Sequence, residues 1–184
     1  MKAQESTLRP HPTSSCDAIR RFGAAIDRAA HAPDWRISFR IEGATSRLRL
    51  PLPGSARRSD GLWQHTCFEA FLQADANDSY YEFNFAPSGE WAAYRFGGRR
   101  IDPTSPEMPA PPIVFKRSMA GCELIADVPI YALPELAAAP VVRAGLSAVV
   151  ESEDGSFSWW ALAHAGDKPD FHDPSTFVLR VTPG

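Results

Sequence analysis

A chain of 184 residues that is 44% hydrophobic and 22% charged has the composition of a folded globular domain, which excludes intrinsic disorder. Its formal net charge of −3 gives no general attraction to phosphate backbones or anionic lipid, so we expect neither a nucleic-acid nor a membrane partner. We predict one domain over residues 1–184, and the 17 prolines favour short strands joined by turns over long helices.

The amino-terminal residues 1–16 lack the apolar stretch of a secretory signal, and no run in the chain has the length of a membrane span. We therefore expect a cytoplasmic protein. Cys16, Cys67 and Cys122 are odd in number and widely spaced, which predicts reduced thiols rather than a disulfide framework or a metal site.

The first elements are predicted from hydrophobic periodicity. Residues 17–29 are ambiguous, because their apolar side chains fit one face of a helix as well as a strand. Residues 34–42 alternate strictly, with an apolar side chain at Trp35, Ile37, Phe39 and Ile41, which predicts a half-buried strand. Residues 44–52 repeat the alternation, so we expect a hairpin that turns at Glu42-Gly43.

The remaining chain also favours strands. Strand-like runs cover residues 62–72, 80–86, 91–96, 113–117, 122–130, 141–150, 157–162 and 176–181. A proline-dense segment at 101–112 is expected to cross between sheets, and residues 131–139 are the best helix candidate. So many half-apolar strands need a second layer to cover them. The sequence therefore predicts an all-β, antiparallel, two-sheet β-sandwich with one or two short helices.

The three most aromatic runs, 62–72, 80–86 and 91–96, suggest a ligand site. If these strands are neighbours, alternation assigns one sheet face to Trp63, Glu69, Glu82, Asn84, Trp91 and Arg95. Aromatic walls with a few directed polar groups are typical of small-molecule pockets, and sugars in particular present CH faces to indoles and hydroxyls to polar groups. The plainer alternative is an exposed Glu69–Arg95 ion pair, worth about 0–1 kcal/mol, with the indoles in the core.

Several segments together resemble the bacterial DOMON-like domains related to family 9 carbohydrate-binding modules. They are LWQHTCFEAFL, YYEFNFAPSGEWAAYRF, SWWALAH and KPDFH, with LRPHP near the start. The resemblance covers nearly the whole chain and implies a β-sandwich in which residues 17–29 form an early strand. It also implies a non-catalytic module that holds a sugar or another polyhydroxylated molecule between tryptophans, without a cofactor.

In such modules a tryptophan six positions before a glutamate flanks the sugar, a late tryptophan closes over it, and an arginine assists the glutamate. Here Trp63 and Glu69 match the spacing, Arg95 is the candidate arginine, and the late tryptophan is Trp159 or Trp160. The sequence departs from the pattern at Thr66 and Cys67, where those modules often carry an acidic residue.

Two alternatives remain open at this point. The aromatic face could instead dock a partner protein or a second copy of the chain. Other DOMON members bind haem through Met and His, for which the candidates are Met1, Met108, Met119, His65, His164 and His172. An enzyme is not expected, because His164, Asp170 and His172 match no metal or acid–base motif. We expect Asp170 to cap a turn and His172 to hydrogen-bond the backbone.

Overall fold

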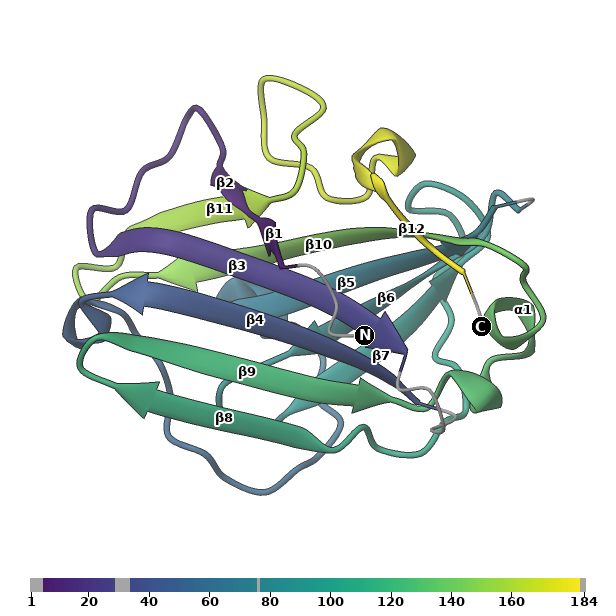
Figure 1. Ribbon diagram of the computed structural model, residues 1–184, viewed down its shortest axis with the longest axis horizontal. Coiled ribbons are helices and arrows are strands. Elements are labelled where there is room, and N and C mark those ends of the chain that lie inside the picture. The colour runs from purple at the N-terminus through teal and green to yellow at the C-terminus, as the bar shows by residue number, and fades with distance from the viewer. Residues whose placement is uncertain (1–4, 29–33, 76, 183–184) are drawn as a thin grey trace.

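The computed structural model describes residues 5–28, 34–75 and 77–182, and in these residues strands make up nearly all of the regular secondary structure (Figure 1). The predicted all-β, two-sheet antiparallel sandwich is confirmed. Sheet A has the strand order β1 (Ser6–Thr7), β3 (Ile19–Arg28), β4 (Trp35–Gly43), β9 (Gly121–Val128) and β8 (Ile113–Ser118).

Sheet B lies behind sheet A in the view of Figure 1. Its order is β2 (Arg9–Pro10), β11 (Phe157–Ala161), β10 (Val142–Glu151), β5 (Cys67–Ala74), β6 (Tyr80–Phe85) and β7 (Trp91–Phe96), with β12 (Leu179–Val181) also paired to β10. Short helical turns connect the strands: η1 (Thr45–Arg47), η2 (Leu62–Gln64), η3 (Ile130–Ala132), α1 (Pro134–Ala137) and η4 (Pro174–Thr176). No helix among the described residues is long and apolar enough to cross a membrane.

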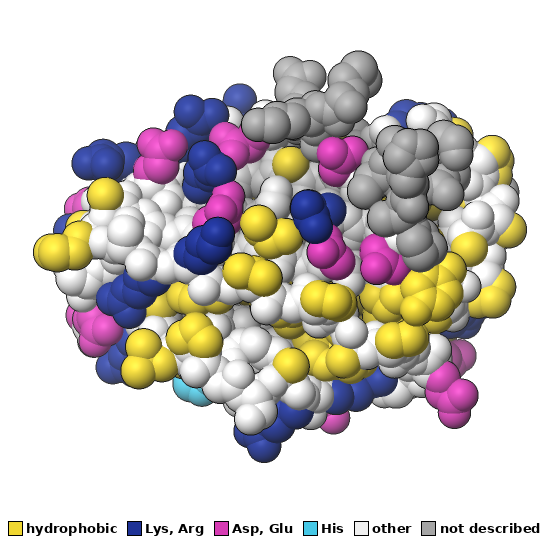
Figure 2. All heavy atoms as spheres, turned by 60° about the horizontal axis from the view of Figure 1, so that its bottom comes forward, with side chains coloured by type: hydrophobic (Ala, Val, Ile, Leu, Met, Phe, Trp, Pro, Cys, Tyr) yellow, Lys and Arg dark blue, Asp and Glu magenta, His cyan; other side chains and the backbone are white. Residues whose placement is uncertain are grey.

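The main core fills the space between the two sheets. In sheet A, alternate residues of β4 and β9 are buried, as the period of two predicts. The facing side chains of sheet B are also apolar, and on β5, β6 and β7 they include Phe68, Ala70, Leu72, Tyr81, Phe83, Phe85 and Ala93. The outer face of sheet A is polar: Figure 2 shows basic and acidic side chains interspersed over it, and two of its cross-strand ion pairs are Arg36–Asp127 and Arg40–Glu123.

Three local predictions need correction. The prediction of a hairpin that turns at Glu42-Gly43 is wrong, because both residues belong to β4. This strand pairs with β3 on one side and with β9 on the other. Residues 44–52 therefore form no strand; they contain η1 and a single bridge from Leu48 to Ser152. The strand expected at 62–72 begins only at Cys67, and the helix expected at 131–139 is limited to η3 and the four-residue α1.

Two other predictions are confirmed. The strand chosen for residues 17–29 is β3, which covers Ile19–Arg28, while residue 29 lies outside the described residues. The three cysteines are free, and the thiols of Cys67 and Cys122 are buried in the sandwich.

The outer face of sheet B carries a second apolar cluster, and this arrangement positions the site. The cluster is formed by Phe71, Tyr80, Phe96, Val149, Ala161, Phe171 and Phe177. Phe171 and Phe177 come from the segment after β11, residues 162–178, which we call the covering segment and which follows β11 at the top of Figure 1. A Cβ atom at Gly145 would lie 2.8 Å from Phe177 Cδ1, so the glycine lets this segment pack directly on the sheet.

Candidate functional site

A cleft of about 420 Å³ lies on the outer face of sheet B, beside the covering segment. Its lining combines aromatic rings with a few ionisable groups: Trp63, Glu69, Glu82, Tyr94, Phe96, Arg100, Pro103, Val149, Trp159, Pro169, Phe171 and His172. The central strands supply the floor, and η2, β11, the loop after β7 and the covering segment supply the walls. The cleft has the mixture of apolar surface and directed polar groups that small-molecule sites share.

Cross-strand pairing explains how the polar floor is assembled. Glu69 on β5 pairs with Ser147 on β10 and with Asn84 on β6, so these three side chains form one row across the outer face. Glu82 occupies the next row, opposite Phe71. The Asn84 amide donates a hydrogen bond of 2.8 Å to Glu82 Oε1. Glu69 is only 3% exposed and has no side-chain hydrogen bond to any described residue.

Burial dominates the electrostatics of the floor. Burial raises the pKa of Glu69 well above its usual value, and the neighbouring Glu82 raises it further. Burial also raises the pKa of Glu82, although the hydrogen bond from Asn84 and the charge of Arg100 oppose that shift. Two carboxyl groups that resist ionisation therefore lie side by side under the cleft. Two buried polar atoms beside them, Asn84 Oδ1 and Ser147 Oγ, have no partner among the described residues.

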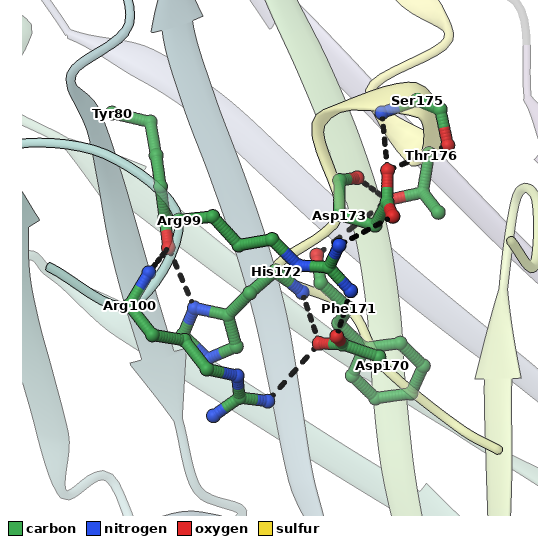
Figure 3. Close-up of polar contacts among 9 residues, drawn as sticks. All are labelled: Tyr80, Arg99, Arg100, Asp170, Phe171, His172, Asp173, Ser175 and Thr176. Carbon is green, nitrogen blue, oxygen red and sulfur yellow. Dashed lines mark hydrogen bonds and ion pairs between the residues drawn. The ribbon is translucent and has the colours of Figure 1, made fainter. Parts of the chain in front are cut away.

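His172 connects the covering segment to the floor (Figure 3). Its ring packs edge-on against Phe71 and Phe96, and its Nδ1 atom lies 2.8 Å from the Tyr80 hydroxyl. The backbone N–H of Arg100 donates to that hydroxyl, which leaves the hydroxyl hydrogen free for Nδ1. When the hydroxyl donates to Nδ1, the ring proton is on Nε2, which lies 3.6 Å from Glu82 Oε2. Burial, and next the charge of Arg100, lower the pKa of His172 to about 4, so the imidazole is neutral near pH 7.

Two arginines and two aspartates form a charge-balanced rim beside His172, as Figure 3 shows. Arg100 Nη2 lies 3.0 Å from Asp170 Oδ1, and Arg99 Nη1 lies 3.0 Å from Asp173 Oδ2. Burial alone would raise the pKa of Asp170, but hydrogen bonds from Arg99, from the His172 backbone N–H and from Arg100 lower it to about 2. Each guanidinium of the rim thus has a carboxylate partner.

The covering segment is also attached to the amino-terminal strand β2. His11 accepts a hydrogen bond from the backbone N–H of Thr13 at Nδ1, so its Nε2 donates to the Gly166 carbonyl at 3.0 Å. His164 Nε2 lies 2.9 Å from the Arg9 carbonyl oxygen, and the two imidazoles meet edge to face. Residues distant in sequence therefore hold one wall of the cleft in place.

The aromatic walls approach the carboxyl groups from opposite ends of the strand order. Trp159 lies on β11, opposite Val149 of β10. Trp63 lies on η2 and meets the ring of Tyr94 on β7, with 6.3 Å between centroids. The Tyr94 hydroxyl donates to Asp60 at 2.6 Å, which ties the loop carrying Trp63 to the sheet. With 46% of its surface exposed, Trp63 is available to a ligand.

The structure brings together only part of the predicted site. Trp63, Glu69, Glu82 and Trp159 line the cleft, and Asn84 lies in its floor row. Three other predicted residues lie on the inner face of sheet B, opposite the cleft. They are Trp91 and Trp160, which are 5% and 6% exposed in the main core, and Arg95, which pairs with Tyr81 across the strands and forms an ion pair with Glu135.

The prediction that Glu69 and Arg95 share a face is therefore wrong, and the register of β6 and β7 is the reason. Glu82 pairs with Tyr94, so even-numbered residues of both strands share the outer face. The turn between these strands could have revealed this. It is a three-residue loop, Pro87-Ser88-Gly89, closed by the Ala86–Glu90 pair, with Gly89 in the left-handed region at φ 90.

The sequence analysis also missed Tyr94, Arg100, Phe171 and His172 as cleft residues. Asp170 does cap a turn by accepting a hydrogen bond from the His172 backbone N–H. The His172 ring, however, bonds the side chain of Tyr80 rather than the backbone. No local pattern connects residue 172 to residues 80 and 82, because only the fold of the covering segment brings them together.

Two of the haem candidates, Met108 and His172, lie on different sides of sheet B. Met108 packs against the main core, whereas His172 lies on the outer face of sheet B, and Met119 is exposed. Met1 lies outside the described residues. Within the described part of the chain, no group of three or more His, Cys, Asp or Glu side chains is arranged to hold a metal ion.

No family model matches the chain, and no curated protein matches it. Among solved structures, the fold is similar to that of a protein from Bacteroides uniformis described as a "putative carbohydrate-binding protein". The TM-score is 0.62, and the match covers 95% of this chain and 84% of that one. At 13% sequence identity this likeness concerns the fold alone: a two-sheet β-sandwich, which in this chain has a concave cleft on the outer face of sheet B.

Proposed function

We propose that the protein is a non-catalytic binding module that holds a sugar, or another small polyhydroxylated molecule, in the cleft. The observation that carries the proposal is the placement of two accessible indoles, Trp63 and Trp159, on either side of two buried carboxyl groups, Glu69 and Glu82. A pyranose ring presents apolar CH faces to such indoles and hydroxyl groups to such carboxyls.

The Glu69 carboxyl group at the floor of the cleft favours a ligand with several hydrogen-bond donors. Glu69 lacks a side-chain partner in the described residues, and its carboxyl lines the cleft. A bound hydroxyl group would supply the missing hydrogen bond. The resemblance to DOMON-like and family 9 carbohydrate-binding domains, and the fold of the Bacteroides uniformis protein, support the same ligand class.

The shape of the site favours a small molecule over a docked protein. A docking surface for a partner is broad and flat, whereas here the polar groups lie at the bottom of a concavity of about 420 Å³. That volume lies within the range of small-molecule pockets. The walls are also held by the Tyr94–Asp60 and His11–Gly166 hydrogen bonds, which favours a preformed site.

Isothermal titration calorimetry with a panel of mono- and disaccharides tests the proposal. We expect at least one saccharide to bind the wild type, and Trp63→Ala to weaken that binding by about tenfold or more, which corresponds to about 1.4 kcal/mol. Trp91→Phe is the matched control, because it removes an indole on the other face of the sheet and should leave the affinity unchanged. Absence of saccharide binding, or equal effects of the two substitutions, would refute the proposal.

A further inference from the structure

The charges around the cleft are unevenly matched. At the rim, Arg99 and Arg100 are paired with Asp170 and Asp173. At the floor, Glu69 and Glu82 have no arginine or lysine within ion-pairing distance among the described residues. His172 Nε2 lies 3.6 Å from Glu82, and the charge of Arg100 acts on both carboxyl groups from beyond ion-pairing distance. Because burial and Arg100 keep the pKa of His172 low, that ring provides no positive charge near pH 7.

The polar groups of the floor are rich in acceptors. Asn84 uses its amide nitrogen to bond Glu82, which leaves its Oδ1 atom without a partner. Ser147 Oγ, in the same row, also lacks one. The side chain of Glu69 is only 3% exposed, lines the cleft and has no hydrogen-bond partner among the described residues. Of these residues Glu69 lines the cleft, and its carboxyl group would be satisfied by a ligand that supplies N–H donors and a positive charge.

The walls suit a cation as well. Trp63, Tyr94, Phe96, Trp159 and Phe171 line the space above the carboxyl groups. Aromatic faces attract a cationic nitrogen through the ring quadrupole, and the attraction grows when water is excluded. Aromatic walls above a buried carboxyl pair therefore form a surrounding in which a protonated amine is stabilised from several sides.

We propose that the ligand carries a protonated amine close to its hydroxyl groups, as an amino sugar or an aminopolyol does, and that this amine binds beside Glu69 and Glu82. This inference rests on the proposed function and specifies the ligand class. A neutral sugar would satisfy hydrogen bonds but add no positive charge to that of Arg100, the charge that favours ionisation of these two carboxyl groups. A metal ion is a weaker candidate, because the described residues offer no group of three ligands.

The test compares sugars that differ only at one nitrogen or oxygen. Glucosamine, galactosamine and mannosamine are titrated beside glucose, galactose and mannose and beside the three N-acetylated forms, at a pH where the free amines are protonated. We expect at least one amino sugar to bind about tenfold or more tighter than both its neutral and its N-acetylated counterparts.

Variants then locate the preference. Glu82→Gln and Glu69→Gln keep the size of each side chain and remove its charge, so each should reduce the ratio of amino-sugar to neutral-sugar affinity severalfold. Glu123→Gln, which removes a carboxylate paired with Arg40 on sheet A, is the matched control and should leave the ratio unchanged. Thermal unfolding of each variant verifies that it is folded.

The outcomes separate this inference from the proposed function. Equal or tighter binding of the neutral or N-acetylated sugars overturns the amine inference while the sugar-binding function stands. An amine preference that persists in both Glu→Gln variants also overturns it. If no sugar of any kind binds the wild type, both proposals fail.

Discussion

The two faces of sheet B are made by the same strands yet have opposite chemistry. On the inner face, the side chains of β5 and β6 are all apolar and pack against sheet A. On the outer face, the alternating partners of those residues include Glu69, Glu82 and Asn84, which are equally buried. Residue type, and not burial, distinguishes the two faces.

The comparison teaches what each face is for. An interior that is closed on all sides selects apolar groups, because a buried polar group without a partner is costly. The outer face retains such groups beside a cleft, so their cost is not offset within the described structure. Natural proteins tolerate such unfavourable buried polar groups where the groups bind a ligand or take part in a reaction. The predictions below test this difference between the faces, from the largest expected effect to the smallest.

Adjacent tryptophans on β11 should respond very differently to truncation. Trp160 is in the main core, where it contacts Phe22 and donates its indole N–H to Ser158 Oγ at 2.9 Å. We expect Trp160→Ala to reduce the free energy of unfolding by about 3–5 kcal/mol, and Trp159→Ala, at the cleft wall, by about 1 kcal/mol. Urea unfolding measures both. Equal losses would show that the outer face is an ordinary core.

Acid should destabilise the protein through His172. In the unfolded chain a histidine takes up a proton near pH 6.5, whereas in the folded protein the pKa of His172 is lowered to about 4. The unfolded state therefore binds the proton first, and stability falls as the pH decreases from about 7 to 4, by about 3 kcal/mol. We expect His172→Gln to flatten this loss in urea unfolding measured at several pH values. A pH dependence identical to wild type would contradict the assignment.

Glu69→Gln should make the protein more stable. Burial and Glu82 raise the pKa of Glu69 in the folded state, so the ionised carboxylate destabilises the fold at high pH. The cost disappears as the pH falls through the folded pKa toward the unfolded value. We expect a gain of about 1 kcal/mol or more at pH 8 that shrinks on acidification. A loss of stability at pH 8 would indicate that the carboxylate stabilises the fold.

The smallest effect on folding is expected for Trp63→Ala. The side chain is 46% exposed and contacts Tyr94 on the same wall of the cleft. Its removal should reduce the free energy of unfolding by less than about 1 kcal/mol while binding of the saccharide is weakened. A stability loss of several kcal/mol, measured by urea unfolding, would place this indole in the core instead.

The alternation of single strands could be read from the sequence, whereas their relative register could not. The period of two in residues 34–42 and 80–86 appears directly in β4 and β6. To match the faces of β6 and β7 one must know which residues pair across the two strands. The sequence analysis assumed a register that put Arg95 beside Glu69. A shift of one residue exchanges the two faces of a strand. The three-residue loop that ends at Gly89 decides this register.

By itself, the sequence determined that the chain is all-β, that it forms a two-sheet antiparallel sandwich, and that Trp63, Glu69 and Glu82 belong to aromatic strand-rich segments. These properties are local, because they depend on periodicity and turn residues within about ten positions. Only the tertiary structure decided which tryptophans are core, that Arg95 lies on the opposite face, and that His172 and Arg100 join the cleft. The physical reason is that strand pairing and the packing of the covering segment at Gly145 are contacts between distant residues, which no local pattern specifies.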